Sequence, residues 1–159
     1  LVQVPVAQTT DLPLNNSPNL AQFINTNTAA LLTDTHVVPV TFNGAPFLAG
    51  SALTNPGHFW NAPGITNPDA RFHFSVNTCN GCHAGETNTF FTHVSERAAG
   101  QRPALSAFLN GRVTVPDPAL LTAPAEFDEP RRRAEALLLA TQQPAALFQV
   151  FVRPVQEPH

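Results

Sequence analysis

Both cysteines of the chain lie in one short stretch, and a histidine follows the second cysteine directly. The stretch reads Cys79-Asn80-Gly81-Cys82-His83. Two thiols separated by two residues can form thioether bonds to the two vinyl groups on one edge of a haem, and the next residue then lies beneath the iron. The spacing predicts one covalently attached haem c, with Cys79 and Cys82 as attachment sites and His83 as the proximal ligand.

Two other kinds of site use the same residue types. The thiols could form a redox-active pair or a disulfide, and with His83, His93 or His73 they could bind zinc in a tetrahedral site. A zinc site would more often bring a second pair of cysteines, and the sequence has none. A thioredoxin-like protein would place the pair among alternating strands and helices, which the chain lacks. We therefore favour haem.

The composition limits both the ligation of the iron and the choice of partners. The chain has no lysine, methionine or tyrosine. Without methionine, one chain cannot provide His/Met ligation, so we expect a second histidine or a vacant position and a lower reduction potential. All eight basic residues are arginines, the net charge is −3, and 12% of the residues are charged. Strong electrostatic steering is therefore not expected, and neither is nucleic-acid binding, which needs a basic surface.

The haem hypothesis also predicts where the protein works. No stretch is long and apolar enough to span a membrane, and the chain begins at Leu1. Because thioether attachment takes place outside the cytosol, we expect export to the periplasm or the extracellular space and removal of a signal peptide. The length of 159 residues suits one domain. We expect an N-terminal arm or edge strand at residues 1–16 and a single haem-binding domain at residues 17–159.

The patterns predict a mainly α-helical fold with long irregular loops and a few short strands. Ser17 and Pro18 open a helix that should continue to about Leu32. An extended segment follows at residues 34–42, and the stretch at residues 43–69 is rich in glycine, proline and asparagine. The apolar residues of this long loop either cover one face of the porphyrin or form a small core of their own: Phe47, Leu48, Phe59, Trp60 and Ile65.

The second half of the chain should contain shorter elements. We expect a short helix through the motif, a helical turn at residues 105–109 and a strand at residues 113–115. Asp128 should cap a last helix, whose inner face would carry apolar residues, and a final strand should follow at residues 148–152. The expected apolar residues of that helix are Ala134, Leu137, Leu138 and Leu139.

Five histidines remain as candidates for the sixth position of the iron, namely His36, His58, His73, His93 and His159. We favour His93, because Phe90, Phe91 and Val94 would bury its ring, and we rank His36 second. A chain of ten residues reaches easily around a haem. His159 could instead bind the haem of a neighbouring copy and so build a homo-oligomer or a longer assembly.

The propionates of a haem need cations or hydrogen-bond donors. Arg97 and Arg102 follow the motif closely and are the first candidates, with Arg71 and the indole of Trp60 behind them. For each of these arginines, the alternative is an ordinary surface position. The run at residues 131–133 is interpreted as the solvated face of a helix, with acidic neighbours at Asp128, Glu129 and Glu135.

The motif resembles the haem-attachment motif of c-type cytochromes, which implies the same roles for the two cysteines and His83. The chain departs from small class I cytochromes, which carry the motif near an N-terminal helix and a methionine later. More loosely, residues 59–64, residues 77–86 and Arg132-Arg133-Ala134 resemble exported bacterial proteins of unassigned function. This second resemblance implies no activity.

Three functions are compatible with these observations. The favoured one is electron transfer through one haem, with a redox protein or a neighbouring haem subunit as the partner. An open-site haem could instead act on peroxide or bind a small gas, with His93 or His36 as the distal base and Arg97 as the stabilising charge. The protein could also be a subunit of an extracellular haem assembly, joined through residues 1–6 or His159.

Overall fold

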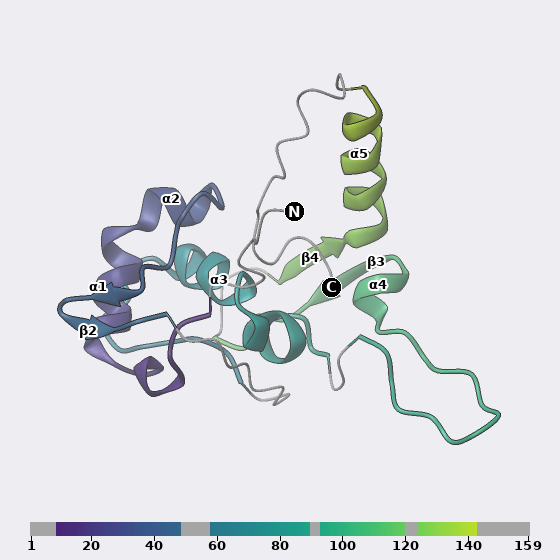
Figure 1. The fold of residues 1–159 in the computed structure, drawn as a ribbon, viewed down its shortest axis with the longest axis horizontal. Coiled ribbons are helices and arrows are strands. Elements are labelled where there is room, and N and C mark those ends of the chain that lie inside the picture. The colour runs from purple at the N-terminus through teal and green to yellow at the C-terminus, as the bar shows by residue number, and fades with distance from the viewer. Residues whose placement is uncertain (1–8, 49–57, 90–92, 120–123, 143–159) are drawn as a thin grey trace.

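The computed structural model describes residues 9–48, 58–89, 93–119 and 124–142. Helix α3 (Pro68–Val76) lies in the middle of the molecule. The elements that precede it in sequence lie on one side of it, and the elements that follow the motif lie on the other (Figure 1). The motif itself directly follows α3.

The first predicted helix forms, but it is divided into two. Helix α1 (Pro18–Thr26) begins where expected, since the hydroxyl of Ser17 accepts a hydrogen bond from the Leu20 amide at 3.2 Å. Helix α2 (Thr28–Leu32) follows after Asn27. The Asn27 side chain donates to the Phe23 carbonyl at 2.8 Å, and this side chain–backbone bond accompanies the end of the first helix.

A small hairpin follows the helices. Strands β1 (Thr41–Phe42) and β2 (Ala45–Pro46) pair antiparallel. The turn between them is Asn43-Gly44, and both residues have positive φ angles, 51° and 76°. This turn matches the right-handed twist of paired strands. The predicted extended segment is thus confirmed only in part, because residues 35–39 belong to no strand.

Residues of the long loop belong to the main core. Phe47 and Trp60 are completely buried, and the Phe47 ring lies 4.8 Å from the Phe23 ring between centroids. Trp60 makes an edge contact with Phe74 of α3 at 6.1 Å. Within the described part of the loop, these two aromatic residues belong to the main core and pack against α1 and α3. The full cluster is Leu20, Ala21, Phe23, Ile24, Leu31, Val38, Phe47, Trp60, Ala62, Ala70 and Phe74.

The N-terminal segment is attached to this core where it is described. Thr10 forms an antiparallel bridge with Leu48, and the Asp11 amide donates to the Phe47 carbonyl at 2.8 Å. A single 3₁₀ turn, η1 (Leu12–Leu14), follows. Residues 1–8 and the strand expected at residues 148–152 lie outside the described residues.

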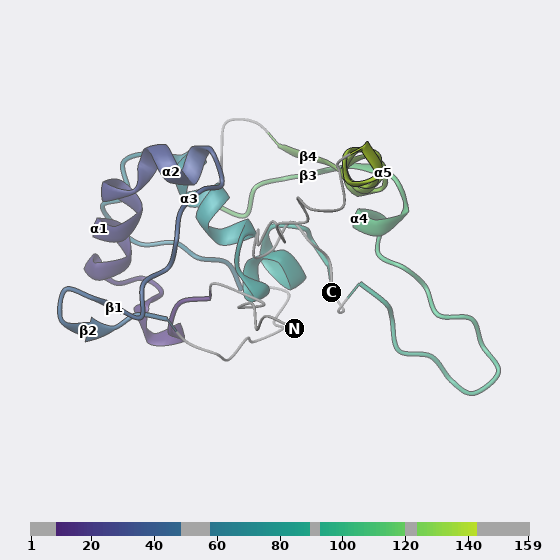
Figure 2. The same ribbon diagram turned by 45° about the horizontal axis from the view of Figure 1, so that its top comes forward.

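Beyond the motif, the elements form a second layer. Helix α4 (Ala107–Asn110) leads into strand β3 (Arg112–Val115), which pairs antiparallel with β4 (Ala125–Asp128). Helix α5 (Glu129–Gln142) follows β4 directly, and Figure 2 shows it nearly end-on beside the two strands. The helical turn, the strand at residues 113–115 and the last helix are confirmed. Strand β4 was not predicted.

The expected inner face of α5 is wrong. Leu137, Leu138 and Leu139 are 67%, 56% and 59% exposed. Three consecutive residues of a helix span about 200° of its circumference, so they cannot all face one neighbour. The start of α5 was predicted correctly, since the Arg131 amide donates to the Asp128 carboxylate at 3.2 Å.

The described residues thus form a mixed fold of helices and two small antiparallel sheets. None of the described helices has the length and apolar character needed to cross a membrane.

Candidate functional site

The motif adopts a helical turn, as expected, but one of unusual width. Residues 81–85 form a π-helix, η2 (Gly81–Gly85), in which the Glu86 amide donates to the Gly81 carbonyl at 3.0 Å. The Thr78 hydroxyl accepts from the Gly81 amide at 3.0 Å and donates to the Ser75 carbonyl at 2.6 Å. This hydroxyl therefore joins the end of α3 to the start of the motif's turn. Single turns of π-helix are rare and occur often at functional sites.

Both glycines of this turn are needed for close backbone packing. A Cβ atom on Gly81 would lie 2.0 Å from the Ser75 carbonyl oxygen. A Cβ atom on Gly85 would lie 2.3 Å from the carbonyl oxygen of His58, which accepts the Gly85 amide at 2.9 Å. Glycine thus lets the turn lie directly against two other backbone segments.

The two thiols of the motif are free and differ in exposure. Cys79 is half-buried and Cys82 is buried. Burial raises the pKa of the Cys82 thiol to about 12, and the neighbouring Cys79 and Glu129 add to this rise. This shift keeps the Cys82 thiol protonated, whereas the thiols of redox-active pairs have lowered pKa values. The described residues also contain no group of three or more acidic, histidine or cysteine side chains arranged to hold a metal ion.

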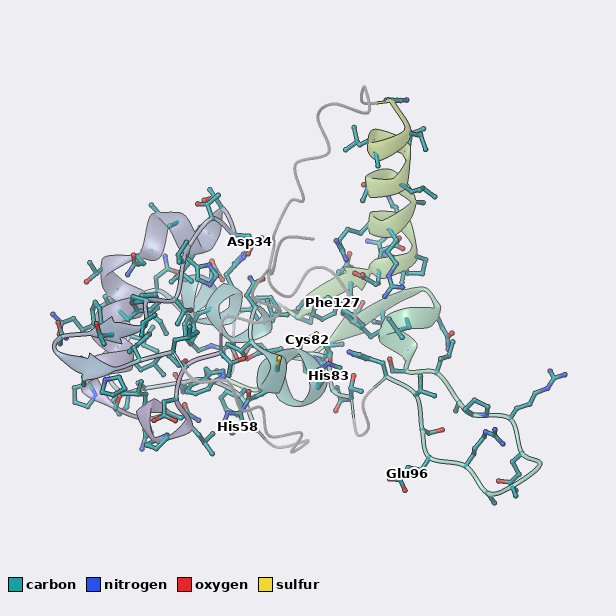
Figure 3. The ribbon with its side chains drawn as sticks, in the orientation of Figure 1. Asp34, His58, Cys82, His83, Glu96 and Phe127 are labelled. Atoms are coloured by element: carbon teal, nitrogen blue, oxygen red, sulfur yellow. The ribbon has the colours of Figure 1, made fainter. Side chains whose placement is uncertain are left out.

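His93 lies directly beside the motif. Its ring centroid is 4.4 Å from that of His83, and its Nε2 atom is 3.9 Å from the Cys82 sulfur. Phe108 of α4 stacks on His93 at 5.1 Å, with an angle of 22° between the rings. His93 is thus enclosed between an aromatic ring and the motif. Cys82 and His83 are labelled at the centre of Figure 3.

The surroundings of His93 keep its imidazole neutral. Burial and the neighbouring His83 lower the pKa of His93 to about 4. A histidine binds a metal through a ring nitrogen that carries no hydrogen, so the imidazole must be neutral. The His93 backbone has a positive φ of 61°, a conformation that costs free energy for a residue with a side chain. The contacts of the His93 ring and backbone with Phe108 and Ser106 must therefore compensate for this cost.

The other described histidines lie elsewhere. His36 is buried against Phe74, and desolvation lowers its pKa. His73 on α3 pairs with Asp34 at 3.0 Å, and the two side chains are only 32% and 15% exposed. The His58 ring contacts Trp60, 5.3 Å away between centroids, and only its backbone carbonyl bonds to the motif's turn. His159 lies outside the described residues.

Arg71 and Trp60, two of the residues expected to bind propionates, have other roles in this structure. The Arg71 guanidinium is buried and donates to Glu86 at 2.6 Å, to Asp117 at 3.0 Å and to the Trp60 carbonyl at 2.9 Å. The Trp60 side chain is fully buried in the core. Two carboxylates neutralise the Arg71 guanidinium, and the Trp60 ring packs against Phe74 of α3, although Nε of Arg71 and Nε1 of Trp60 have no hydrogen-bond partner among the described residues.

The other two expected arginines do not lie beside the motif. Residues 94–105 form a loop that projects away from the molecule, closed at its base by an antiparallel bridge between Val94 and Leu105 (Figure 1). Figure 3 shows Glu96 on this loop, well separated from Cys82 and His83. Arg97 donates to the Gln101 carbonyl at 2.9 Å within the loop, and Arg102 is exposed on it.

The arginines that do come near the motif are at the start of α5. Arg132 and Arg133 both donate to the buried carboxylate of Glu129, at 2.8 Å and 3.0 Å. The charges of Glu129 and Arg132 act on Cys82, and those of Arg133 and Glu129 act on His93. The solvated helix face predicted for this run is largely confirmed, because the side chains of Arg131, Arg132 and Arg133 are 73%, 34% and 45% exposed. The acidic neighbours were correct, but nothing in the local pattern indicated that the run lies beside the motif.

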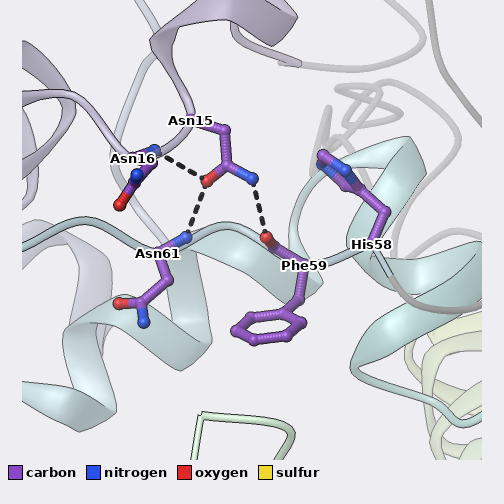
Figure 4. Close-up of a pocket in the computed structure, with 5 residues that line it drawn as sticks. All are labelled: Asn15, Asn16, His58, Phe59 and Asn61. Atoms are coloured by element: carbon purple, nitrogen blue, oxygen red, sulfur yellow. Dashed lines mark hydrogen bonds between the residues drawn. The ribbon is translucent and has the colours of Figure 1, made fainter.

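A pocket of about 260 Å³ is lined in part by His58 and Phe59, the two residues against which Gly85 of the motif's turn packs (Figure 4). It is formed by Asn15, Asn16, His58, Phe59 and Asn61. The Asn15 side chain accepts from the Asn61 amide at 2.9 Å and donates to the Phe59 carbonyl at 3.0 Å. The Asn15 amide group therefore ties the N-terminal turn to the segment before α3.

The chemistry of the side chains around His83 fits a covalently bound haem. Two free thiols one helical turn apart and two imidazoles are the donors that such a group needs. Because a metal–imidazole bond is about 2 Å long, two imidazoles on opposite sides of one iron have ring centres roughly 6 Å apart. The contact between His83 and His93, at 4.4 Å, would therefore have to widen by roughly 2 Å.

Comparisons with models of protein families, with characterised proteins and with solved structures find no match to this chain.

Proposed function

We propose that the protein is an exported mono-haem c-type cytochrome that transfers electrons and performs no reaction on a substrate. When bound, the haem supplies an iron that changes between two oxidation states. In this proposal Cys79 and Cys82 hold the haem through thioether bonds, and His83 binds the iron on the proximal side. The mid-chain motif and the lack of methionine distinguish the protein from small class I cytochromes.

The observation that carries the proposal is the contact between His83 and His93. Among the described histidines, His93 is the one whose ring contacts the ring of His83. Burial keeps it neutral and Phe108 holds its ring. We therefore infer that His93 is the distal ligand. A second histidine in this position favours electron transfer over an open site for peroxide or a gas.

Arg132 and Arg133 are the arginines we propose for the propionates. The charge of Arg132 acts on Cys82 and that of Arg133 acts on His93, and both guanidinium groups already donate to a carboxylate, that of Glu129. A propionate could take the place of Glu129 as acceptor for one guanidinium. The proposal replaces Arg97 and Arg102 in this role.

Expression of the full chain with a bacterial export signal and the haem-attachment machinery tests the proposal. We expect one haem per chain that stays with the protein during acid–acetone extraction. The reduced spectrum should be that of a low-spin, six-coordinate haem that does not bind added carbon monoxide. A protein without covalent haem would refute the proposal, and a high-spin haem that binds carbon monoxide at once would favour the open-site alternative.

Replacement of His93 tests the distal ligand. His93→Ala should convert the low-spin spectrum to a high-spin one, because the iron then loses its sixth ligand. His73→Ala is the matched control, since the His73 ring pairs with Asp34 and takes no part in the contact between His83 and His93. An unchanged spectrum in His93→Ala would contradict the assignment of the distal ligand while leaving covalent attachment in place.

A further inference from the structure

The two ring nitrogens of His93 face different groups. Nε2 faces the Cys82 sulfur at 3.9 Å, and Nδ1 lies 3.1 Å from the Ser106 hydroxyl. In the chain without attached haem, the Cys82 thiol can donate a weak hydrogen bond to an imidazole nitrogen, so the contact favours a lone pair on Nε2. The hydrogen of the neutral ring then sits on Nδ1, where the Ser106 oxygen can accept it.

The hydroxyl of Ser106 is diverted from its ordinary role. Ser106 occupies the N-cap position of α4, where a serine normally accepts a hydrogen bond from the helix backbone. Its side chain makes no such bond. It bonds instead to His93, which is thirteen residues earlier in the chain. The N-terminus of α4 therefore has no side-chain cap from Ser106, because the Ser106 hydroxyl is hydrogen-bonded to the His93 ring.

Backbone contacts hold the two residues in register. The Ser106 amide donates to the His93 carbonyl at 2.8 Å, and both residues are buried. The bridge between Val94 and Leu105 lies next to this bond and closes the projecting loop. His93 and Ser106 are thus joined by a backbone hydrogen bond and by a side-chain hydrogen bond. The two bonds together fix the position of Ser106 Oγ relative to the His93 ring.

We propose that Ser106 is a positioning residue for His93: its hydroxyl accepts the Nδ1 hydrogen, fixes the tautomer and turns the Nε2 lone pair towards the motif. This inference rests on the proposed function in so far as His93 is the distal ligand. Partners that bind the second nitrogen of a ligating histidine typically change metal affinity by 10–100-fold when they are removed. Ser106 would act through His93 without touching the iron.

The test compares three variants of the full chain. Ser106→Ala removes the acceptor, Ser106→Thr keeps a hydroxyl, and Ser95→Ala is the matched control. The Ser95 hydroxyl accepts from the Ala104 amide at 3.0 Å in the same loop, and no contact with His93 is involved. Spin state and the affinity for added cyanide are measured in the haem-loaded proteins.

We expect Ser106→Ala to become partly high-spin and to bind cyanide roughly tenfold more tightly. Ser106→Thr should restore the native spectrum, and Ser95→Ala should match the native protein. If Ser106→Ala is indistinguishable from the native protein in both measurements, or if Ser95→Ala shows the same change, the inference is wrong.

A second measurement does not depend on haem. Nitrogen-15 NMR of the full chain produced without haem attachment reports which nitrogen of His93 carries the hydrogen. Hydrogen on Nδ1 in the native chain, with a mixture of tautomers in Ser106→Ala, supports the inference even if no haem ever attaches. Hydrogen on Nε2 in the native chain overturns it, whatever the outcome for the proposed function.

Discussion

At the scale of single residues, the buried side chain of Arg71 connects three parts of the chain. It lies on α3 and pairs with Glu86, at the end of the motif's turn, and with Asp117, in the segment after β3. Two carboxylates thus share one guanidinium. Burial raises the pKa of Glu86, against the opposing effect of Arg71 and with a further contribution from Asp117. Arg71 is therefore the group that makes both carboxylates tolerable in the interior.

Removal of this guanidinium should destabilise the protein strongly. Arg71→Met leaves two buried carboxylates without a cation, and breaking a buried pair in this way costs about 3–5 kcal/mol. Arg131→Met is the control, because the ion pair of Arg131 with Glu135 is 73% and 59% exposed. Ion pairs this exposed contribute little to stability, because water and salt screen them. Urea unfolding followed by Trp60 fluorescence measures both, and equal losses would contradict the prediction.

His36 should make the stability depend on pH. Desolvation lowers the pKa of its buried ring, with Asp34 opposing the shift. As pH falls below about 6.5, the unfolded chain binds a proton that the folded chain resists, so the free energy of unfolding must decrease. His36→Leu should reduce this decrease. Unfolding free energies of both proteins between pH 7 and pH 5 are the measurement, and parallel curves would exclude His36 as the cause.

Some roles of single residues can be predicted from the sequence and others cannot. The roles expected for Cys79, Cys82 and His83 follow from their spacing alone and stay predictions until haem is measured. The sequence favours His93 because of Phe90, Phe91 and Val94, but the first two lie outside the described residues and Val94 is 46% exposed. The residue that stacks on the His93 ring is Phe108, which the local pattern did not indicate. The role of Arg71 could not be predicted, because its carboxylate partners are 15 and 46 residues away in the sequence. The residues that flank Arg71 in the sequence do not indicate which distant carboxylates the fold brings to it.

At the scale of elements, the π-helical turn depends on its two glycines. Ala at position 81 or 85 would bring Cβ within 2.0 Å or 2.3 Å of a backbone oxygen, so the turn must shift. We expect Gly81→Ala and Gly85→Ala each to destabilise the protein by about 1–3 kcal/mol. They should also lower the yield of attached haem, because the turn carries Cys82 and His83.

Gly111→Ala provides the control for these variants. Gly111 has extended backbone, and a Cβ atom added to it would meet no other atom within 4 Å. Its replacement should therefore change stability by less than about 0.5 kcal/mol. Thermal unfolding of the three variants under one condition makes the comparison. The explanation by close packing fails if Gly111→Ala is as damaging as the other two.

Elements with a local start signal were predicted well. Ser17 with Pro18, and Asp128 ahead of the last helix, are visible in any short window of sequence, and both helices begin there. Strand β4 could not be predicted, because its pairing with β3 depends on a partner strand and not on its own pattern. The predicted inner face of α5 was wrong for a similar reason. Burial of Leu137, Leu138 and Leu139 depends on which element packs against the helix, and the sequence of the helix does not specify that element.

At the scale of the whole molecule, charge is sparse and largely paired. Only 12% of the residues are charged, and the net charge is −3. Within the described residues, Arg71, Arg112, Arg131, Arg132 and Arg133 each pair with a carboxylate. The remaining two described arginines lie on the projecting loop, away from the motif. No large patch of one sign therefore surrounds His83 among these side chains.

Electron exchange should accordingly depend little on salt. Steering by a charged surface accelerates association by 10-fold to 1,000-fold and disappears as salt screens the field. For the haem-loaded protein, we expect the rate of reduction by an anionic and by a cationic small molecule to change less than about threefold between low and high ionic strength. Stopped-flow measurement of both reductants decides this. A steep decrease for one reductant and a rise for the other would reveal a charged docking surface, and Arg97→Gln with Arg102→Gln would then test whether the projecting loop provides it.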